Sequence, residues 1–245
     1  MWGFNKGSYI ERTHLKFCKR LLSVKQSTQN NFIYGETGRI SYIQRRYFNI
    51  IKYWLKICCS QNAKYIKIVY DMLKNNNETY RNNVNWASQV KKLLSTLGFY
   101  EVWLNQGVGD KNHFLSIFKS RLEDNFIQKW NAELNDSSRA IFYRTFSSFG
   151  FANYLDVLNI TKYRSAFTRL RLSSHRLEVE CGRWRKPLRV PFDDRKCRQC
   201  NSLEDEYHFL IECNNYNELR NTYIKPYFWK HPSYFKCIQL LTTEN

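Results

Sequence analysis

The distribution of proline is the feature of this sequence that most restricts its fold. The chain contains four prolines, Pro187, Pro191, Pro226 and Pro232, and the first 186 residues contain none. Proline disrupts the interior of a helix because it lacks a backbone N–H and its ring clashes with the preceding turn. In the proline-free region, apolar residues recur at spacings of three and four, which is typical of amphipathic helices. The sequence therefore predicts a mainly α-helical body.

Seven amphipathic patterns mark the expected helices. They cover residues 9–24, 40–58, 64–74, 86–97, 114–134, 139–146 and 161–172. We expect loops at residues 75–79 and 106–110, where asparagine and glycine interrupt the apolar spacing. Gly98 is expected to end the fourth helix at its C′ position, and Asp110 and Asp136 are expected to cap the two helices after it.

The chain is expected to consist of two parts. Its 245 residues are enough for one large core or two modest ones. We predict a boundary near residue 160, so that residues 1–160 form an α-helical body. Residues 161–245 are predicted to form a basic segment followed by a small, loop-rich module that zinc stabilises, with turns and short elements from Ser173 onward. The predicted fold class is therefore mainly α.

Three cysteines and one histidine near the C-terminus predict a metal site. The sequence has the spacing Cys-x2-Cys, then seven residues, then His-x4-Cys, formed by Cys197, Cys200, His208 and Cys213. Two thiolates separated by two residues can bind one ion from a single turn, and the second pair lies about one helical turn apart. Cys3His is a ligand set of structural zinc sites, which have no open coordination position. We therefore predict one bound Zn²⁺ with a structural role.

A disulfide framework accounts for the eight cysteines less well than a metal site does. Such frameworks are typical of short secreted chains, whereas this chain is long and its first residues lack the apolar segment of a signal peptide. We therefore expect an intracellular protein, nuclear or cytosolic. A redox-active Cys-x2-Cys remains an alternative, and Cys181 and His175 are alternative ligands. Cys58 and Cys59 lie within an apolar helical pattern and are expected to fill a core.

The charge of the chain predicts a polyanionic partner. The net charge is +18, the pI is near 9.6, and 43% of the residues are hydrophobic, which is too many for a disordered chain. Alternatively, the scattered lysines serve only solubility or reflect the codon bias of an A/T-rich genome. No apolar stretch is long enough to span a bilayer, so we expect no membrane partner.

A basic segment directly before the metal ligands is the predicted nucleic-acid surface. Nine cations and only two carboxylates lie between Lys162 and Arg189, and aromatic residues are interleaved with them. Guanidinium groups pair well with phosphates, and exposed rings stack on bases. The residues expected to contact RNA or DNA are Arg169, Arg171, Arg176, Arg183, Trp184, Arg185, Lys186 and Arg189. The alternative is that Phe167 and Leu170 face a core and the arginines only solvate the outer face.

The sequence gives little support for catalysis. The motif Pro191-Phe-Asp-Asp194 has only a superficial likeness to a polymerase metal motif, and a turn is the better interpretation. Phosphate-binding, nucleophile-elbow and zinc-protease motifs are not found. Four protein ligands leave a zinc ion no position for a reactive water. We therefore expect neither enzymatic activity nor a small-molecule substrate.

The residues of the C-terminal region carry a resemblance to a known family. The run Cys197-Arg-Gln-Cys200, followed by Tyr207-His-Phe-Leu-Ile-Glu-Cys213, Tyr216 and Arg220, resembles the C-terminal zinc knuckle of LINE-type (non-LTR) retrotransposon reverse transcriptases. The segment from Leu170 to Trp184 looks like the stretch before that knuckle. Pieces that are similar to the region after the polymerase core are Trp2-Gly-Phe4, His14 to Lys25, Tyr34 to Arg39 and Trp103-Leu-Asn-Gln-Gly107.

The resemblance implies a role in binding element RNA or target DNA, with the four residues of the quartet as metal ligands. The polymerase carboxylates and the endonuclease domain of that family are not found in this sequence, so polymerase activity is not expected. The sequence thus predicts a non-catalytic, zinc-dependent nucleic-acid-binding fragment. The alternatives are a protein-interaction module, with the aromatic residues between Tyr227 and Phe235 as its surface, or a degenerate element remnant without a selected function.

Overall fold

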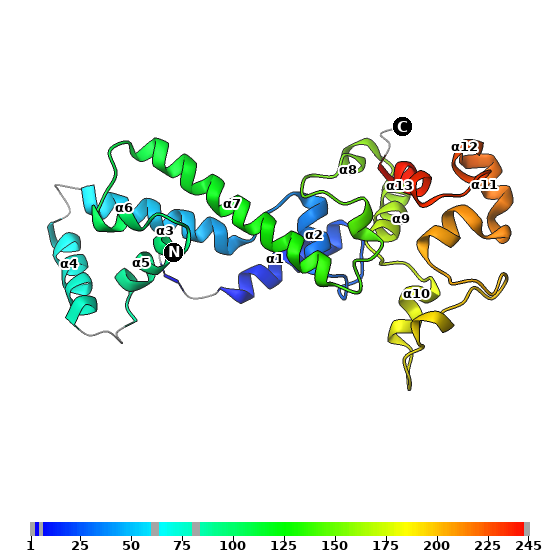
Figure 1. Cartoon of the computed structure of the whole chain (residues 1–245), viewed down its shortest axis with the longest axis horizontal. Coiled ribbons are helices and arrows are strands. Elements are labelled where there is room, and N and C mark those ends of the chain that lie inside the picture. The colour runs from blue at the N-terminus through cyan, green and yellow to red at the C-terminus, as the bar shows by residue number, and fades with distance from the viewer. Residues whose placement is uncertain (1–2, 5–6, 60–63, 80–83, 243–245) are drawn as a thin grey trace. The chain divides into compact units, whose positions relative to one another are not determined.

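The computed structural model describes residues 3–4, 7–59, 64–79 and 84–242, and over these residues the protein is mainly helical (Figure 1). The described residues form no β-strand; an isolated antiparallel bridge joins Lys196 and Leu203. The α-helices are α1 (Ser8–Leu21), α2 (Asn30–Thr37), α3 (Tyr42–Cys59), α4 (Lys64–Thr79), α5 (Trp86–Thr96), α6 (Tyr100–Leu104), α7 (Lys111–Asp136), α8 (Tyr154–Val157), α9 (Thr161–Arg171), α10 (Glu178–Cys181), α11 (Asn217–Tyr223), α12 (Pro226–Trp229) and α13 (Tyr234–Thr242). The expected mainly α fold is therefore confirmed.

The chain divides into two compact units. The first contains residues 1–13 and 40–131, and the second contains residues 14–39 and 132–245. The boundary that the sequence predicts near residue 160 falls inside the second unit, and an early segment with α2 also belongs to that unit. Periodicity locates helices along a chain, but it does not say which helices pack together, so this division leaves no trace in the sequence pattern.

The core of the first unit is built from α3, α5 and the elements around them. Trp54 of α3 is fully buried, as are Val90 and Leu94 of α5. Trp54 stacks on Trp103 with ring centroids 6.0 Å apart, and its indole N–H donates to the hydroxyl of Tyr70 at 2.9 Å. The indole therefore buries a large apolar surface without leaving its polar atom unpaired.

The second unit is held by an aromatic core and by a small C-terminal cluster. Phe32 of α2 packs on Tyr143 with ring centroids 4.5 Å apart, and both side chains are almost completely buried. Ile211, Cys237 and Leu241 form a second cluster with residues near η1 (Tyr143–Thr145). This cluster packs the segment that carries the predicted metal ligands against α13. Apolar contacts therefore help to stabilise the C-terminal module, in addition to any bound metal.

Several helix boundaries follow the sequence expectation. The side chain of Asp110 accepts hydrogen bonds from the backbone N–H groups of Asn112 and His113, so Asp110 caps α7 as predicted. Gly98 follows α5 with φ +82, the left-handed conformation expected at C′. Both predictions are confirmed, because capping depends on residues that are adjacent in the sequence.

Two local predictions are wrong. Residues 139–146, predicted as a helix that Asp136 caps, contain only the 3-10 turn η1, and Asp136 is the last residue of α7. The aromatic residues of this stretch are instead held in tertiary contacts, such as that of Tyr143 with Phe32. Residues 75–79, predicted as a loop, extend α4 to Thr79. Asparagine costs a helix less than about 1 kcal/mol per residue, so a continuing helix tolerates the run.

Candidate metal centre and basic segment

The first two ligands lie on one tight turn. The backbone N–H of Cys197 donates to Ser202 O at 2.7 Å, and the N–H of Asn201 donates to Cys197 O at 2.9 Å. Asn201 has φ +55, a left-handed conformation that asparagine tolerates better than most residues. These bonds fold the chain back within six residues, so the thiols of Cys197 and Cys200 lie on the same side of the turn.

The other two ligands lie on one helical turn. Residues His208–Glu212 form a short π-helical turn, and the backbone N–H of Cys213 donates to His208 O at 2.8 Å. The carboxylate of Asp205 accepts a hydrogen bond from the backbone N–H of His208 at 2.8 Å and fixes the start of the turn. The wider turn brings His208 and Cys213 together across five sequence positions.

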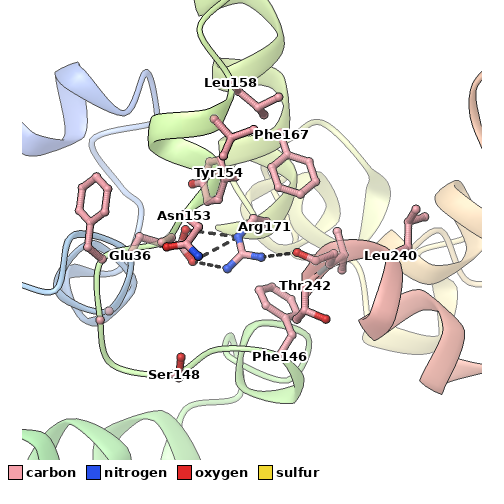
Figure 2. A pocket seen from close by; sticks show the side chains of 16 residues that line it. Glu36, Phe146, Ser148, Asn153, Tyr154, Leu158, Phe167, Arg171, Leu240 and Thr242 are labelled. Atoms are coloured by element: carbon pink, nitrogen blue, oxygen red, sulfur yellow. Dashed lines mark hydrogen bonds and ion pairs between the residues drawn. The ribbon is translucent and has the colours of Figure 1, made fainter. Parts of the chain in front are cut away.

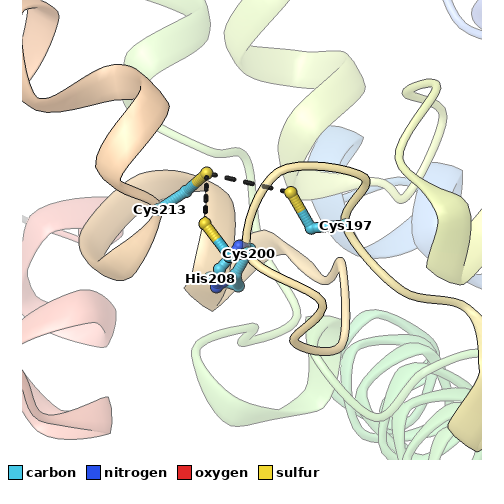
Figure 3. Close-up of side chains that lie close together, drawn as sticks. All are labelled: Cys197, Cys200, His208 and Cys213. Carbon is cyan, nitrogen blue, oxygen red and sulfur yellow. Dashed lines mark hydrogen bonds between the residues drawn. The ribbon is translucent and has the colours of Figure 1, made fainter.

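The four side chains converge on one point (Figure 3). One ligand atom from each of Cys197, Cys200, His208 and Cys213 lies within 4.8 Å of the others. The Sγ–Sγ distances from Cys213 are 3.9 Å to Cys197 and 3.6 Å to Cys200, far longer than a disulfide bond. Tetrahedral geometry with Zn–S bonds of ~2.3 Å places two sulfurs about 3.8 Å apart. The arrangement can therefore hold a metal ion.

The imidazole of His208 supports the same interpretation. The residue is buried, and neither of its ring nitrogens has a hydrogen-bond partner among the described residues. Glu212 Oε2 lies 3.6 Å from Nδ1, which is too long for a hydrogen bond. A buried polar atom without a partner is costly, and a metal bond to one nitrogen would remove that cost. Glu212 would then be placed to orient the ring from its other nitrogen, as partners of metal-bound histidines do.

The thiols of the centre differ in acidity. Burial raises the pKa of Cys197, but the backbone N–H groups of Cys200 and Gln199, which point at its sulfur, and the neighbouring side chains of His208 and Cys213 lower that pKa to about 7. Burial raises the pKa of Cys213 to about 11. The turn therefore prepares the Cys197 thiolate before a metal binds, whereas the Cys213 thiol carries a proton that a metal must displace.

A buried arginine supports the centre. The guanidinium of Arg220, on α11, donates to Cys213 O and, at 2.5 Å, to Asn217 Oδ1. Arg220 is 2% exposed, so this contact is part of the module's interior. The sequence pattern indicated Arg220 only within the resemblance. Arg220 lies seven residues after Cys213, in the helix that follows this last ligand. Its long side chain can therefore reach back to the carbonyl oxygen of Cys213.

The two alternative ligands lie outside the cluster. The thiol of Cys181 donates to Arg176 O at 3.2 Å, and His175 Nε2 lies 2.7 Å from Glu206 Oε1. His175 Nδ1 accepts the backbone N–H of Leu177 at 3.2 Å. Because these polar atoms already have partners, the quartet predicted from spacing is the set that the fold brings together.

The sequence predicts that Arg171 contacts nucleic acid, and the structure corrects this prediction, because the residue is buried. It is 7% exposed and lies in the wall of a cavity of about 530 Å³, where it forms a 2.9 Å ion pair with Glu36 (Figure 2). Its guanidinium also donates to Leu241 O at 2.8 Å and lies over the ring of Phe146. The charge of Arg171 is thus used inside the second unit, and this residue does not belong to a surface for phosphates.

Three further members of the predicted surface are held by carboxylates. Arg183 pairs with the buried carboxylate of Glu180 at 3.2 Å, and Trp184 Nε1 donates to the same carboxylate at 2.8 Å. Arg185 pairs with Glu178 at 2.7 Å and keeps about half of its side chain exposed. These pairs lower the positive charge that the segment offers, although Glu180 also pairs with Arg139 at 3.0 Å and is therefore shared between two arginines.

The remaining four predicted residues are exposed. Arg169 Nε donates to Ser23 O at 2.7 Å, so its charge has a hydrogen bond but no carboxylate partner among the described residues. Arg176, Lys186 and Arg189 are exposed and form no ion pair within the part of the chain that the structure describes. The cations that a polyanion would meet are therefore fewer than the sequence count indicates.

Comparisons with known proteins find no match to a family model, to a curated protein or to a solved structure. Among the described residues, no helix is both long and apolar enough to cross a membrane.

Proposed function

We propose that the C-terminal module binds one Zn²⁺ through Cys197, Cys200, His208 and Cys213, and that the protein uses this module to bind nucleic acid without catalysing a reaction. The observation that carries the proposal is the convergence of three thiols and a buried imidazole within 4.8 Å. Thiolate and imidazole are ligands that zinc prefers, and four of them complete its tetrahedron. The metal then has a structural role and supplies folding free energy to the module.

The nucleic-acid part of the proposal is supported by charge. The net charge of +18 and the exposed cations Arg176, Lys186 and Arg189, which lie outside the ion pairs of the described residues, favour a polyanion. The sequence resemblance to the C-terminal region of non-LTR retrotransposon reverse transcriptases points to the same class of partner. We propose that this chain performs the corresponding task of binding element RNA or target DNA.

Zinc analysis and a salt titration test this proposal together. The purified full-length chain is analysed for metals and titrated with duplex DNA, single-stranded DNA and single-stranded RNA at several salt concentrations. We expect one zinc per chain and an affinity that falls steeply with salt, because binding releases counterions from the phosphates. Cys200→Ser should lose the zinc and weaken binding. A chain without zinc, or binding that ignores salt, would refute the corresponding part of the proposal.

A protein-interaction module is the second candidate function. Tyr223 and Phe235 expose 80% and 71% of their surface, and large exposed aromatic residues are enriched at protein interfaces. This function predicts binding to a protein that salt hardly changes and that Tyr223→Ser with Phe235→Ser abolishes. The same double substitution should leave nucleic-acid affinity unchanged if the first proposal is correct.

A further inference from the structure

Residues 182–190 form a closed loop whose tip is both apolar and basic. The loop follows α10 (yellow in Figure 1) and closes where the backbone N–H of Val190 donates to Gly182 O at 3.0 Å. Leu188, near the tip, is 81% exposed. Lys186 and Arg189 lie on either side of it in the sequence, and both are exposed and outside the ion pairs of the described residues. The loop thus offers one aliphatic side chain between two available cations.

The base of the 182–190 loop is held rigidly. Arg195 is buried, and its guanidinium donates to Val190 O at 3.1 Å and to Val179 O at 2.9 Å, so it ties the end of the loop to α10. A Cβ atom at Gly182 would lie 2.8 Å from Arg195 Cγ, so this approach requires glycine. Leu188 is therefore exposed on a loop whose two ends are held in place by hydrogen bonds.

The loop is also connected to the metal centre. Glu204 follows the turn that carries Cys197 and Cys200, and its backbone N–H donates to Arg195 O at 2.9 Å. The carboxylate of Glu204 accepts the backbone N–H of Glu178 at 2.7 Å at the start of α10. A metal that orders the turn thereby also orders the base of the loop.

The most exposed large hydrophobic side chain of the loop is Leu188, which is aliphatic, and this property favours one kind of nucleic acid. Trp184 is 51% exposed, but its ring lies 5.2 Å from the guanidinium of Arg139 and its N–H is bonded to Glu180, so one face is covered and the ring is held in place. Single-stranded nucleic acids are bound by aromatic rings on which bases stack. Aliphatic side chains such as Leu188 instead enter base steps of duplex DNA from the minor groove and partly unstack them.

We propose that Leu188 is a wedge that inserts into a base step of duplex DNA from the minor groove, with Lys186 and Arg189 neutralising phosphates beside it. This inference rests on the proposed nucleic-acid-binding function and names its partner as double-stranded DNA. The cost of unstacking a step is met by burial of the leucine and by the two phosphate contacts. Flexible pyrimidine–purine steps are then the preferred sites of insertion, because they are the easiest to kink.

The test uses duplex DNA that carries the fluorescent base 2-aminopurine at a TA step, titrated with the zinc-loaded full-length chain. We expect binding to raise the fluorescence, because insertion unstacks the base. Leu188→Ser should abolish this rise and weaken duplex affinity about tenfold, the effect of losing much of the burial of one leucine. The matched control is Leu219→Ser, at a leucine of α11 that is 56% exposed, and it should change neither reading.

The cations are tested by salt dependence. Lys186→Ala with Arg189→Ala should reduce the slope of log affinity against log salt by about 1.8, because two phosphate contacts are lost. The control Lys230→Ala removes an exposed cation outside the loop, and its slope should equal that of the wild-type chain. Zinc content and far-UV circular dichroism of every variant verify that the module is intact.

Each outcome separates the wedge from the broader function. If the wild-type chain binds duplex DNA with a steep salt dependence but Leu188→Ser binds equally well, the wedge is refuted and the proposed function stands. If the wild-type chain binds no nucleic acid, both are refuted. Tighter binding to vesicles with anionic phospholipids than to DNA, lost in Leu188→Ser, would assign the loop to a membrane surface and overturn the wedge.

Discussion

The acidity of single thiols controls how the metal centre responds to protons. Because burial holds the pKa of Cys213 at about 11, this thiol is protonated near neutral pH in the metal-free protein. A metal binds the thiolate and must displace that proton, so acid weakens binding and alkali strengthens it until the thiols are ionised. Cys197 has a pKa of about 7 and is mostly ionised at pH 8, so it contributes a smaller share of the protons that the metal displaces.

We therefore expect zinc binding at pH 8 to release about one proton or more per chain. The measurement is isothermal calorimetry of zinc binding in two buffers with different ionisation enthalpies, whose difference gives the number of protons. Cys58→Ser provides the control, because this cysteine lies outside the cluster and should leave the proton count unchanged. Binding without any proton release would show that Cys213 is not a ligand.

The Glu36–Arg171 ion pair is the residue-level contact on which the second unit should depend most. The two side chains are 1% and 9% exposed, so the removal of one partner leaves the other charge buried and unpaired. Glu36→Gln should lower the free energy of unfolding of that unit by about 3–5 kcal/mol. Arg185→Ala, which removes a surface ion pair, should cost about 1 kcal/mol or less. Urea unfolding followed by circular dichroism compares them, and equal effects would contradict this assignment.

At the scale of elements, the end of α2 depends on one glycine. Gly38 has φ +59, and a Cβ atom there would lie 2.6 Å from the backbone nitrogen of Phe151. Gly98, after α5, has φ +82 with open space around the same position. The two glycines therefore separate the cost of a left-handed conformation from the cost of a steric clash.

We expect Gly98→Ala to destabilise the protein by about 1–2 kcal/mol, the cost of a left-handed conformation for an L-residue. Gly38→Ala should cost clearly more than this, because the backbone near Phe151 must also move. Thermal denaturation of the two variants gives the comparison. A smaller loss of stability in Gly38→Ala than in Gly98→Ala would show that the contact between α2 and residues 150–152 gives way easily.

At the scale of the whole molecule, the metal should matter to one unit and not to the other. The proposed ligands belong to the second unit, and the core around Trp54 belongs entirely to the first. Removal of zinc with a chelator should therefore abolish hydrogen-exchange protection in residues 196–220. The amides of α3 should keep theirs, and mass spectrometry of peptides reads both regions in one experiment. A uniform loss of protection would mean that the two units unfold as one.

The sequence determined those parts of this protein that depend on neighbouring residues. Periodicity located α3, α5, α7 and α9, the cap at Asp110 followed from local hydrogen bonding, and ligand spacing identified the four residues that converge. These signals were sufficient because a helical turn, a cap and a chelating turn are each built from a few consecutive residues.

The tertiary structure alone decided which charges are available and which segments share a unit. Arg171 and Arg189 belong to the same basic run, yet one is paired with Glu36 in the interior and the other is exposed. Glu36 lies 135 positions before its partner, and the guanidinium of Arg195 donates to the carbonyl of Val179, 16 positions before it. Contacts between residues this distant depend on how the helices pack, and packing is not encoded in the spacing of any single segment.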